Sequence, residues 1–139
     1  MATEAPLLHH SQTTASTNMS STAGLAGPNG SGQFLIMQMS GARTVAPSAV
    51  ASGTTVYAGV LQNDPTSGFV ADIGFQGVTK VVVGSGGVTA GSLIGPDSSG
   101  RAVTIAAGSG TYVIGIALDT TTTLGQIGTA LITTPGWKA

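Results

Sequence analysis

The stretch from Thr89 to Ile132 reads TAGSLIGPDSSGRAVTIAAGSGTYVIGIALDTTTTLGQIGTALI. Its breaks at residues 96–100 (PDSSG) and 108–110 (GSG) suit tight turns. Proline presets φ, aspartate bonds its own backbone and glycine accepts a positive φ. Apolar residues alternate with others along 112–118 with the period of two that a strand requires. The stretch therefore predicts two consecutive β-hairpins: strand, turn, strand, Gly-rich turn, strand, loop, strand.

The residues before this stretch continue the β pattern. Turn-forming residues separate short β-compatible segments at 34–39, 54–61, 69–76 and 79–83, and Gly77 is predicted to end the third of them. Together with the later strands, this makes about eight strands at the spacing typical of an all-β sandwich or barrel. We therefore predict one compact all-β domain over residues 34–139. The best helix candidate, 119–124, carries four consecutive threonines, which disfavour helix.

Residues 1–33 differ in composition from everything that follows. Ser, Thr, Ala, Gly and Asn dominate, and the large apolar residues are isolated: Leu7, Leu8, Met19 and Leu25. Such a segment alone buries too little apolar surface to offset its ordering entropy. The Gly- and Pro-rich run at 27–32 reads as a hinge. We expect an extended arm that orders only on a partner, and a chain beginning at Gln33 that stays folded; the alternative is a dispensable tail.

The sequence offers few groups for catalysis or for metal binding. It has no cysteine, and its only histidines are the tandem pair His9 and His10. Adjacent residues of an extended chain point in opposite directions, so the pair is not expected to hold a metal. No histidine in the β region is available to pair with a carboxylate for acid–base chemistry. We therefore expect no catalytic residue, no cofactor and no enzyme.

The charge is small and scattered. The chain of 139 residues has four basic and five acidic residues, a net charge of −1. The dispersed Arg43, Lys80, Arg101 and Lys138 argue against a nucleic-acid partner, which needs clustered positive charge. A chain with so little charge is more plausibly a protein whose surfaces are covered by neighbouring molecules. The alternative interpretation is a secreted β-protein with a Ser/Thr surface.

Two further absences bear on where the protein is found. No apolar run approaches the ~20 residues of a membrane helix, so no membrane partner is expected. The first residues do not have the basic and apolar regions of a secretory signal. We therefore expect the protein to be made in the cytoplasm and to leave only as part of a larger particle.

Four segments of the C-terminal half also carry a family resemblance. They are, in order, Ala90–Ile94; Asp97, Gly100, Arg101 and Val103; Tyr112–Leu118; and Gly125, Gln126, Leu131 and Ile132. Their order and spacing over residues 78–132 resemble the small capsid decoration, or cement, proteins of tailed bacteriophages.

This resemblance implies a small β-rich fold that assembles as homotrimers on the outer capsid surface, at three-fold or quasi-three-fold sites. Such proteins bind the major capsid protein and stabilise the head against internal DNA pressure. The arm is then expected to reach the capsid, where Leu7, Leu8, Met19 and Leu25 fill shallow pockets; these contacts are not implied by the resemblance. The alternative is a head-fibre or a carbohydrate- or receptor-binding β-module, although the aromatic residues that such a site gathers are dispersed here.

Overall fold

The computed structural model describes residues 7–21, 23–49 and 57–139, and within them it is built from strands. The elements are β1 (Leu7–Ala15), the 3-10 turn η1 (Pro28–Gly30), β2 (Ile36–Gly41), β3 (Thr44–Pro47), β4 (Tyr57–Leu61), β5 (Val70–Val82), β6 (Leu93–Pro96), β7 (Ala102–Thr104), β8 (Tyr112–Ala117) and β9 (Ile127–Lys138). No α-helix occurs among the described residues. The predicted all-β fold class is confirmed.

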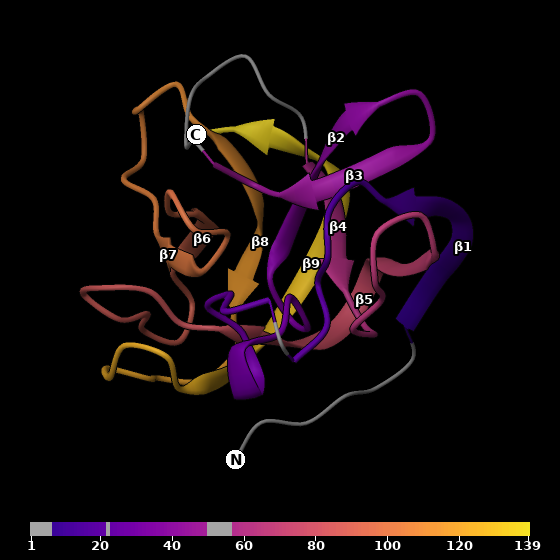
Figure 1. The fold of residues 1–139 in the computed structure, drawn as a ribbon. Coiled ribbons are helices and arrows are strands. Elements are labelled where there is room, and N and C mark those ends of the chain that lie inside the picture. The colour runs from indigo at the N-terminus through magenta and orange to yellow at the C-terminus, as the bar shows by residue number, and fades with distance from the viewer. Residues whose placement is uncertain (1–6, 22, 50–56) are drawn as a thin grey trace.

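The strands form one sheet that closes on itself. Its order is β1-β3-β2-β4-β5-β9-β8-β6-β7, and β1 pairs in addition with β5. This extra pairing closes β1, β3, β2, β4 and β5 into a five-stranded barrel, with β1 and β3 parallel and β1 and β5 antiparallel. The remaining strands extend from β5, and a parallel bridge between Val83 and Ala102 brings β7 back to the end of β5. Figure 1 shows β1 and the β2–β3 hairpin on one side of the molecule and β6 and β7 on the other.

Two apolar clusters fill this architecture. The barrel cluster comprises Ala15, Met19, Leu35, Met37, Val45, Leu61, Ala71, Ile73 and Val82. The second cluster comprises Ile36, Tyr57, Val60, Val81, Val83, Val88, Ile94, Ala102, Ile114, Ala117, Ala130 and Ile132. Strand β5 contributes to both clusters, because Val82 packs in the first and Val81 in the second. Residues on opposite faces of one strand thus hold the barrel and the extension together.

The two predicted hairpins are present. Strand β6 pairs with β7, β8 pairs with β9, and β6 also pairs with β8, each antiparallel. In the first turn the Asp97 carboxylate accepts hydrogen bonds from the backbone N–H groups of Ser99 (2.8 Å) and Arg101 (3.0 Å) and pairs with Arg101 Nε (2.7 Å). The carbonyl of Gly100 accepts from the Ile36 N–H at 2.7 Å, which ties this turn to β2.

The sequence predicts that Gly77 ends a strand, and this prediction is wrong. Strand β5 runs through it, and residues 70–77 pair with β1 while residues 76–82 pair with β9. Gly77 has a φ of +123°, a conformation that side-chain-bearing residues rarely adopt. Glycine therefore accommodates this backbone conformation, and the pairing of β5 with β9 continues through it.

The expected free arm is also absent between residues 7 and 33. Strand β1 pairs with β5 from Leu7 to Thr14 and with β3 at Thr14 and Ala15. Met19 is completely buried in the barrel cluster, and its carbonyl accepts a hydrogen bond from the Gly32 N–H. The composition argument considered this segment alone, whereas its backbone completes the barrel and its few apolar side chains enter a core that other strands build. The predicted boundary at residue 33 therefore does not separate two units.

Candidate functional site

A row of four aliphatic side chains crosses the extension of the sheet. Val78 of β5 lies opposite Leu131 of β9, Leu131 opposite Ile116 of β8, and Ile116 opposite Leu93 of β6. Directly opposed residues of paired strands project from the same face, so these four form the aliphatic row. Ala130 and Ile132 flank Leu131 and point into the second cluster, which places the row on the opposite face of the sheet.

The aliphatic row is partly open to solvent. Leu131 is 39% exposed, and Leu118, two residues beyond Ile116 on the same face, is 46% exposed. Val78, Ile116 and Leu93 are half-buried. The row with Leu118 is therefore an apolar surface formed from four strands.

The positions next to the aliphatic row on the same face have little charge. Thr129 and Thr133 lie on either side of Leu131, with Lys80 and Gln76 opposite them on β5. The Nζ of Lys80 lies over the ring of Phe34, 5.4 Å from its centroid, as in a cation–π contact. Among these neighbouring positions, Lys80 is therefore the one that carries a charge, and its ammonium group contacts the ring of Phe34.

Two more exposed apolar side chains lie on a second row of paired residues, within the barrel. Met39 pairs with Val45, Val45 pairs with Ala15, and the Ala15 N–H donates to the Phe69 carbonyl at 2.9 Å. Val45 and Ala15 are buried, whereas Met39 is 48% exposed and Phe69 is 68% exposed. Met39 and Phe69, which we call the barrel rim, therefore expose apolar side chains at the two ends of a row whose centre is buried.

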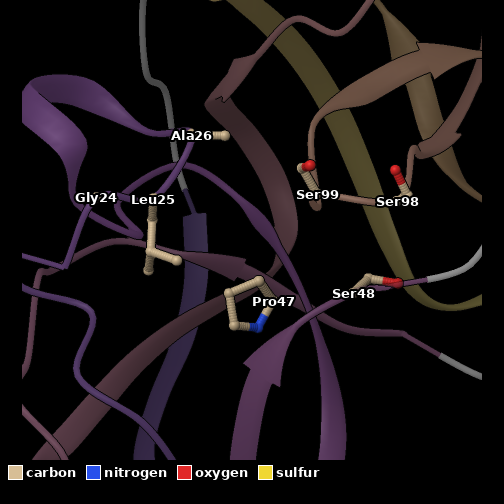
Figure 2. A pocket seen from close by; sticks show the side chains of 7 residues that line it. All are labelled: Gly24, Leu25, Ala26, Pro47, Ser48, Ser98 and Ser99. Carbon is tan, nitrogen blue, oxygen red and sulfur yellow. The ribbon is translucent and has the colours of Figure 1, made fainter.

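A small pocket lies where the N-terminal segment meets the β6–β7 turn. Its volume is about 380 Å³, and it is lined by Gly24, Leu25, Ala26, Pro47, Ser48, Ser98 and Ser99. Figure 2 shows Leu25 and Pro47 on one side and the serines on the other. Ser48 Oγ already donates to Gln38 Oε1 at 3.3 Å. The lining has no acid, base or cation, so the pocket offers shape and hydroxyl groups without the proton-transfer groups of a catalytic site.

The four residues predicted to bind a capsid do not share one surface. Leu8 is exposed on β1, and Leu25 is half-buried in the pocket wall. Met19 lies in the core and is not available to a partner in this structure. The side chain of Leu7 lies outside the described residues. Capsid contacts through Leu7, Leu8 and Leu25 stay predictions.

The histidine pair lies on β1, where His9 is opposite Gly74 and His10 opposite Ile73. Among the side chains that the structure describes, no three His, Cys, Asp or Glu residues are grouped so as to hold a metal ion. Within the same part of the chain, no helix is long and apolar enough to span a membrane.

Tyr57, at the start of β4, carries a hydroxyl group that has no hydrogen-bond partner among the described residues. The side chain is buried in the second cluster, and burial raises the pKa of Tyr57 above its ordinary value of 10.0. The Tyr57→Phe variant is expected to raise the free energy of unfolding at pH 7 by about 1 kcal/mol, because it removes a buried hydroxyl group to which no described residue is hydrogen-bonded.

The same variant should also change the alkaline response. Above pH 10 an unfolded chain releases the Tyr57 proton while the folded chain retains it, so stability falls as the pH rises from there toward the folded-state pKa. The variant should lose less stability over that range. Urea unfolding at pH 7 and at about pH 11 measures both effects, with Tyr112→Phe, in a half-buried position, as the control. A Tyr57→Phe variant less stable than the wild type would contradict this assignment.

No protein-family model matches the chain, and no curated protein matches it. Among solved structures, the chain is similar to the one described as the crystal structure of head fiber gp8.5 N base in bacteriophage phi29, with a TM-score of 0.59 and 18% sequence identity. The similarity covers 96% of this chain and 100% of that one. At this identity the likeness concerns the fold, and it shows that the barrel and its extension together make up an architecture shared with that head-fibre base.

Proposed function

We propose that this protein is a structural component of a bacteriophage virion and binds the outer surface of the capsid. The observation that carries the proposal is the fold likeness to a head-fibre base over nearly the whole of both chains. Residues 78–132 also resemble capsid decoration proteins. This resemblance supports the same class of protein independently, because it comes from the order of sequence motifs and not from the fold.

The surface chemistry supports an assembled protein. The chain combines four basic and five acidic residues with exposed apolar side chains on the aliphatic row and at the barrel rim. Soluble monomers normally rely on interspersed charge and on small apolar patches to stay apart. A protein bound to a shell and to neighbouring copies has less need of that protection, because partners cover such surfaces.

The finer proposal is a decoration, or cement, role as homotrimers at three-fold or quasi-three-fold sites, where each trimer joins neighbouring copies of the major capsid protein and stabilises the shell. Closed symmetry is the usual result of self-association, and a three-fold position on an icosahedral shell matches the symmetry of a trimer.

Capsid binding is tested with capsids of the phage that encodes this chain, prepared without it. The purified protein should co-sediment with these capsids and saturate. Its binding should change little between about 0.1 M and about 1 M salt, because so few charges are present to be screened. Cryo-electron microscopy of the decorated particles should place the density at three-fold or quasi-three-fold positions. Failure to bind would overturn the capsid proposal, and isolated copies elsewhere on the shell would overturn the trimer.

A head fibre or a carbohydrate- or receptor-binding module is the second candidate. The fold likeness to a head-fibre base and the hydroxyl-lined pocket favour it. The pocket lining has no aromatic ring, which sugar and ligand sites commonly use. Binding of the purified protein to host cells or to a glycan array, without binding to capsids, would favour this candidate over decoration.

A further inference from the structure

The chain has three asparagines, at positions 18, 29 and 63, and their side-chain amides differ in how they are held. Asn18 Oδ1 accepts hydrogen bonds from the backbone N–H of Ser20 at 3.1 Å and from its hydroxyl at 2.8 Å. Asn63 is fixed at both ends of its amide, by bonds of 3.0 Å and 2.9 Å to the backbone of β5. The Asn29 amide is exposed and has no hydrogen-bond partner among the described residues. Of the three side chains, that of Asn29 is therefore the one left free to react.

The residue that follows Asn29 is a glycine. The backbone nitrogen of a following residue can attack the carbonyl carbon of an asparagine side chain, and a Cβ on that residue hinders the attack. Gly30 has no Cβ, whereas Asn18 and Asn63 precede Met19 and Asp64. We propose that Asn29 is a site of spontaneous covalent modification, at which the side-chain amide becomes a carboxylate. This inference does not depend on the proposed function.

The conversion uses water as its co-reactant. Hydroxide removes the amide proton of Gly30, and the nitrogen then forms a bond to Cγ of Asn29. The Cγ–Nδ2 bond breaks, Nδ2 takes up a proton and leaves as ammonia, and a cyclic succinimide remains. Water opens this ring, at Cγ to give aspartate or at the backbone carbonyl to give isoaspartate. Each carbon keeps its oxidation state, so the reaction needs neither an oxidant nor a reductant.

The turn η1 holds the two reacting groups apart in the folded protein. Asn29 has a φ of 54° and a ψ of 27°, close to the left-handed region that asparagine tolerates. At this ψ the Gly30 nitrogen lies nearly opposite the Asn29 Cβ about the Cα–C bond, so Cγ cannot reach it. The Gly30 N–H also donates to the Gly27 carbonyl at 3.1 Å. The attack therefore requires the turn to open first.

Local opening of η1 thus controls the rate of modification. Turns at the surface open at a much smaller cost in free energy than global unfolding. Asn29 is exposed, and Pro28 and Gly30 on either side of it are only half-buried. The Pro28 ring fixes its own φ, which reduces the conformational freedom that the segment gains when it opens. We therefore expect slow modification in the folded protein and much faster modification in the unfolded chain.

The products alter the segment that forms one wall of the pocket. Either acid adds a negative charge to a chain whose net charge is −1. Isoaspartate also lengthens the backbone between position 29 and Gly30. The added atom lies inside the loops closed by the Gly30 N–H on the Gly27 carbonyl and by the Leu25 N–H on the Gly30 carbonyl. Since Leu25 lines the pocket, the isoaspartate product should loosen that wall.

The experiment incubates the purified full-length protein at mildly alkaline pH, folded and in concentrated urea. Peptide mass spectrometry follows the conversion of amide to acid at each asparagine, so Asn18 and Asn63 serve as internal controls. A protein isoaspartate methyltransferase labels the isoaspartate product, and the Asn29→Asp variant provides the aspartate standard. The Pro28→Ala variant loosens the turn without changing the reacting pair. Thermal unfolding shows whether each variant is folded.

We expect Asn29 of the folded protein to be converted at least about tenfold faster than Asn18 or Asn63, and faster as the pH rises. Urea should raise the Asn29 rate at least about tenfold, because the turn no longer has to open. Pro28→Ala should raise the rate in the folded protein and leave the rate in urea unchanged. An Asn29 amide that stays intact in the folded protein, or that reacts no faster than the other two, would overturn the site. Equal rates in folded and unfolded chains, or no effect of Pro28→Ala, would overturn the control by the turn.

Discussion

A chain that begins at Gln33 is expected to lose the cooperative unfolding transition of the full protein. The truncation removes β1, which closes the barrel by pairing with both β3 and β5, and it removes Met19 from the barrel cluster. A buried methionine replaced by alanine alone costs about 2–5 kcal/mol, and whole domains are stable by only about 5–15 kcal/mol. Loss of the strand in addition should leave the remaining chain largely unfolded at 25 °C. Far-UV circular dichroism during heating measures this.

Point variants at Met19 separate the core contribution from the strand. Met19→Ala should lower the free energy of unfolding by about 2–5 kcal/mol, because it leaves a cavity in the barrel cluster. Met19→Leu nearly conserves volume and should cost less than about 1.5 kcal/mol. If the chain beginning at Gln33 melted like the full protein, the N-terminal segment would be an independent arm after all.

The Gly115→Ala variant is the second change with a large expected effect. A Cβ at Gly115 would collide with the carbonyl oxygen of Leu131 and would lie 2.9 Å from the Ile132 Cα. Both obstacles are backbone of the paired strand β9, which cannot rotate away as a side chain can. We expect a loss of at least about 3 kcal/mol, at the upper end of the cost of overpacking a core. Urea unfolding provides the measurement.

Gly41→Ala is the matched control for that variant. Its Cβ would meet the hydroxyl of Thr44, a side-chain atom that can rotate, and Gly41 is exposed at the end of β2. The expected cost is below about 1 kcal/mol. Equal losses at the two glycines would contradict the view that the close approach of β8 and β9 requires glycine at position 115.

The hairpins were predictable because their signals are local. The turn around Asp97 needs only the residues from Pro96 to Arg101, and the structure forms it with hydrogen bonds inside that segment. The strand through residues 112–118 was also predictable, but which of its side chains point into the core was predictable only in part. Ile116 and Leu118 lie on the face opposite Ala117 as the alternation predicts, whereas Ile114 is completely buried. A register shift between Val113 and Gly115 interrupts the pairing there, and nothing in the local sequence specifies it.

The candidate surfaces were not predictable for a related reason. The aliphatic row joins Val78, Leu93, Ile116 and Leu131, and their alignment depends on the registers of three separate strand pairs. The burial of Met19 likewise depends on strands that follow it far along the chain. Composition described residues 1–33 correctly as poor in apolar residues, but it does not report the partners that the rest of the fold supplies.

The pairing of β1 with β5, which closes the barrel, also bears on how the chain folds during synthesis. Strand β1 is synthesised before one of its partners, β5, which begins at Val70, so during translation β1 waits several seconds at about 5–20 residues per second for that partner to emerge. Its other partner, β3, offers a parallel ladder of only two residue pairs, Thr14 with Thr44 and Ala15 with Val45. Closure therefore requires a contact of long sequence separation, and such topologies fold in milliseconds to seconds rather than microseconds. Until then the nascent β1 presents an unpaired strand edge, and its low content of large apolar residues reduces the tendency of that edge to aggregate.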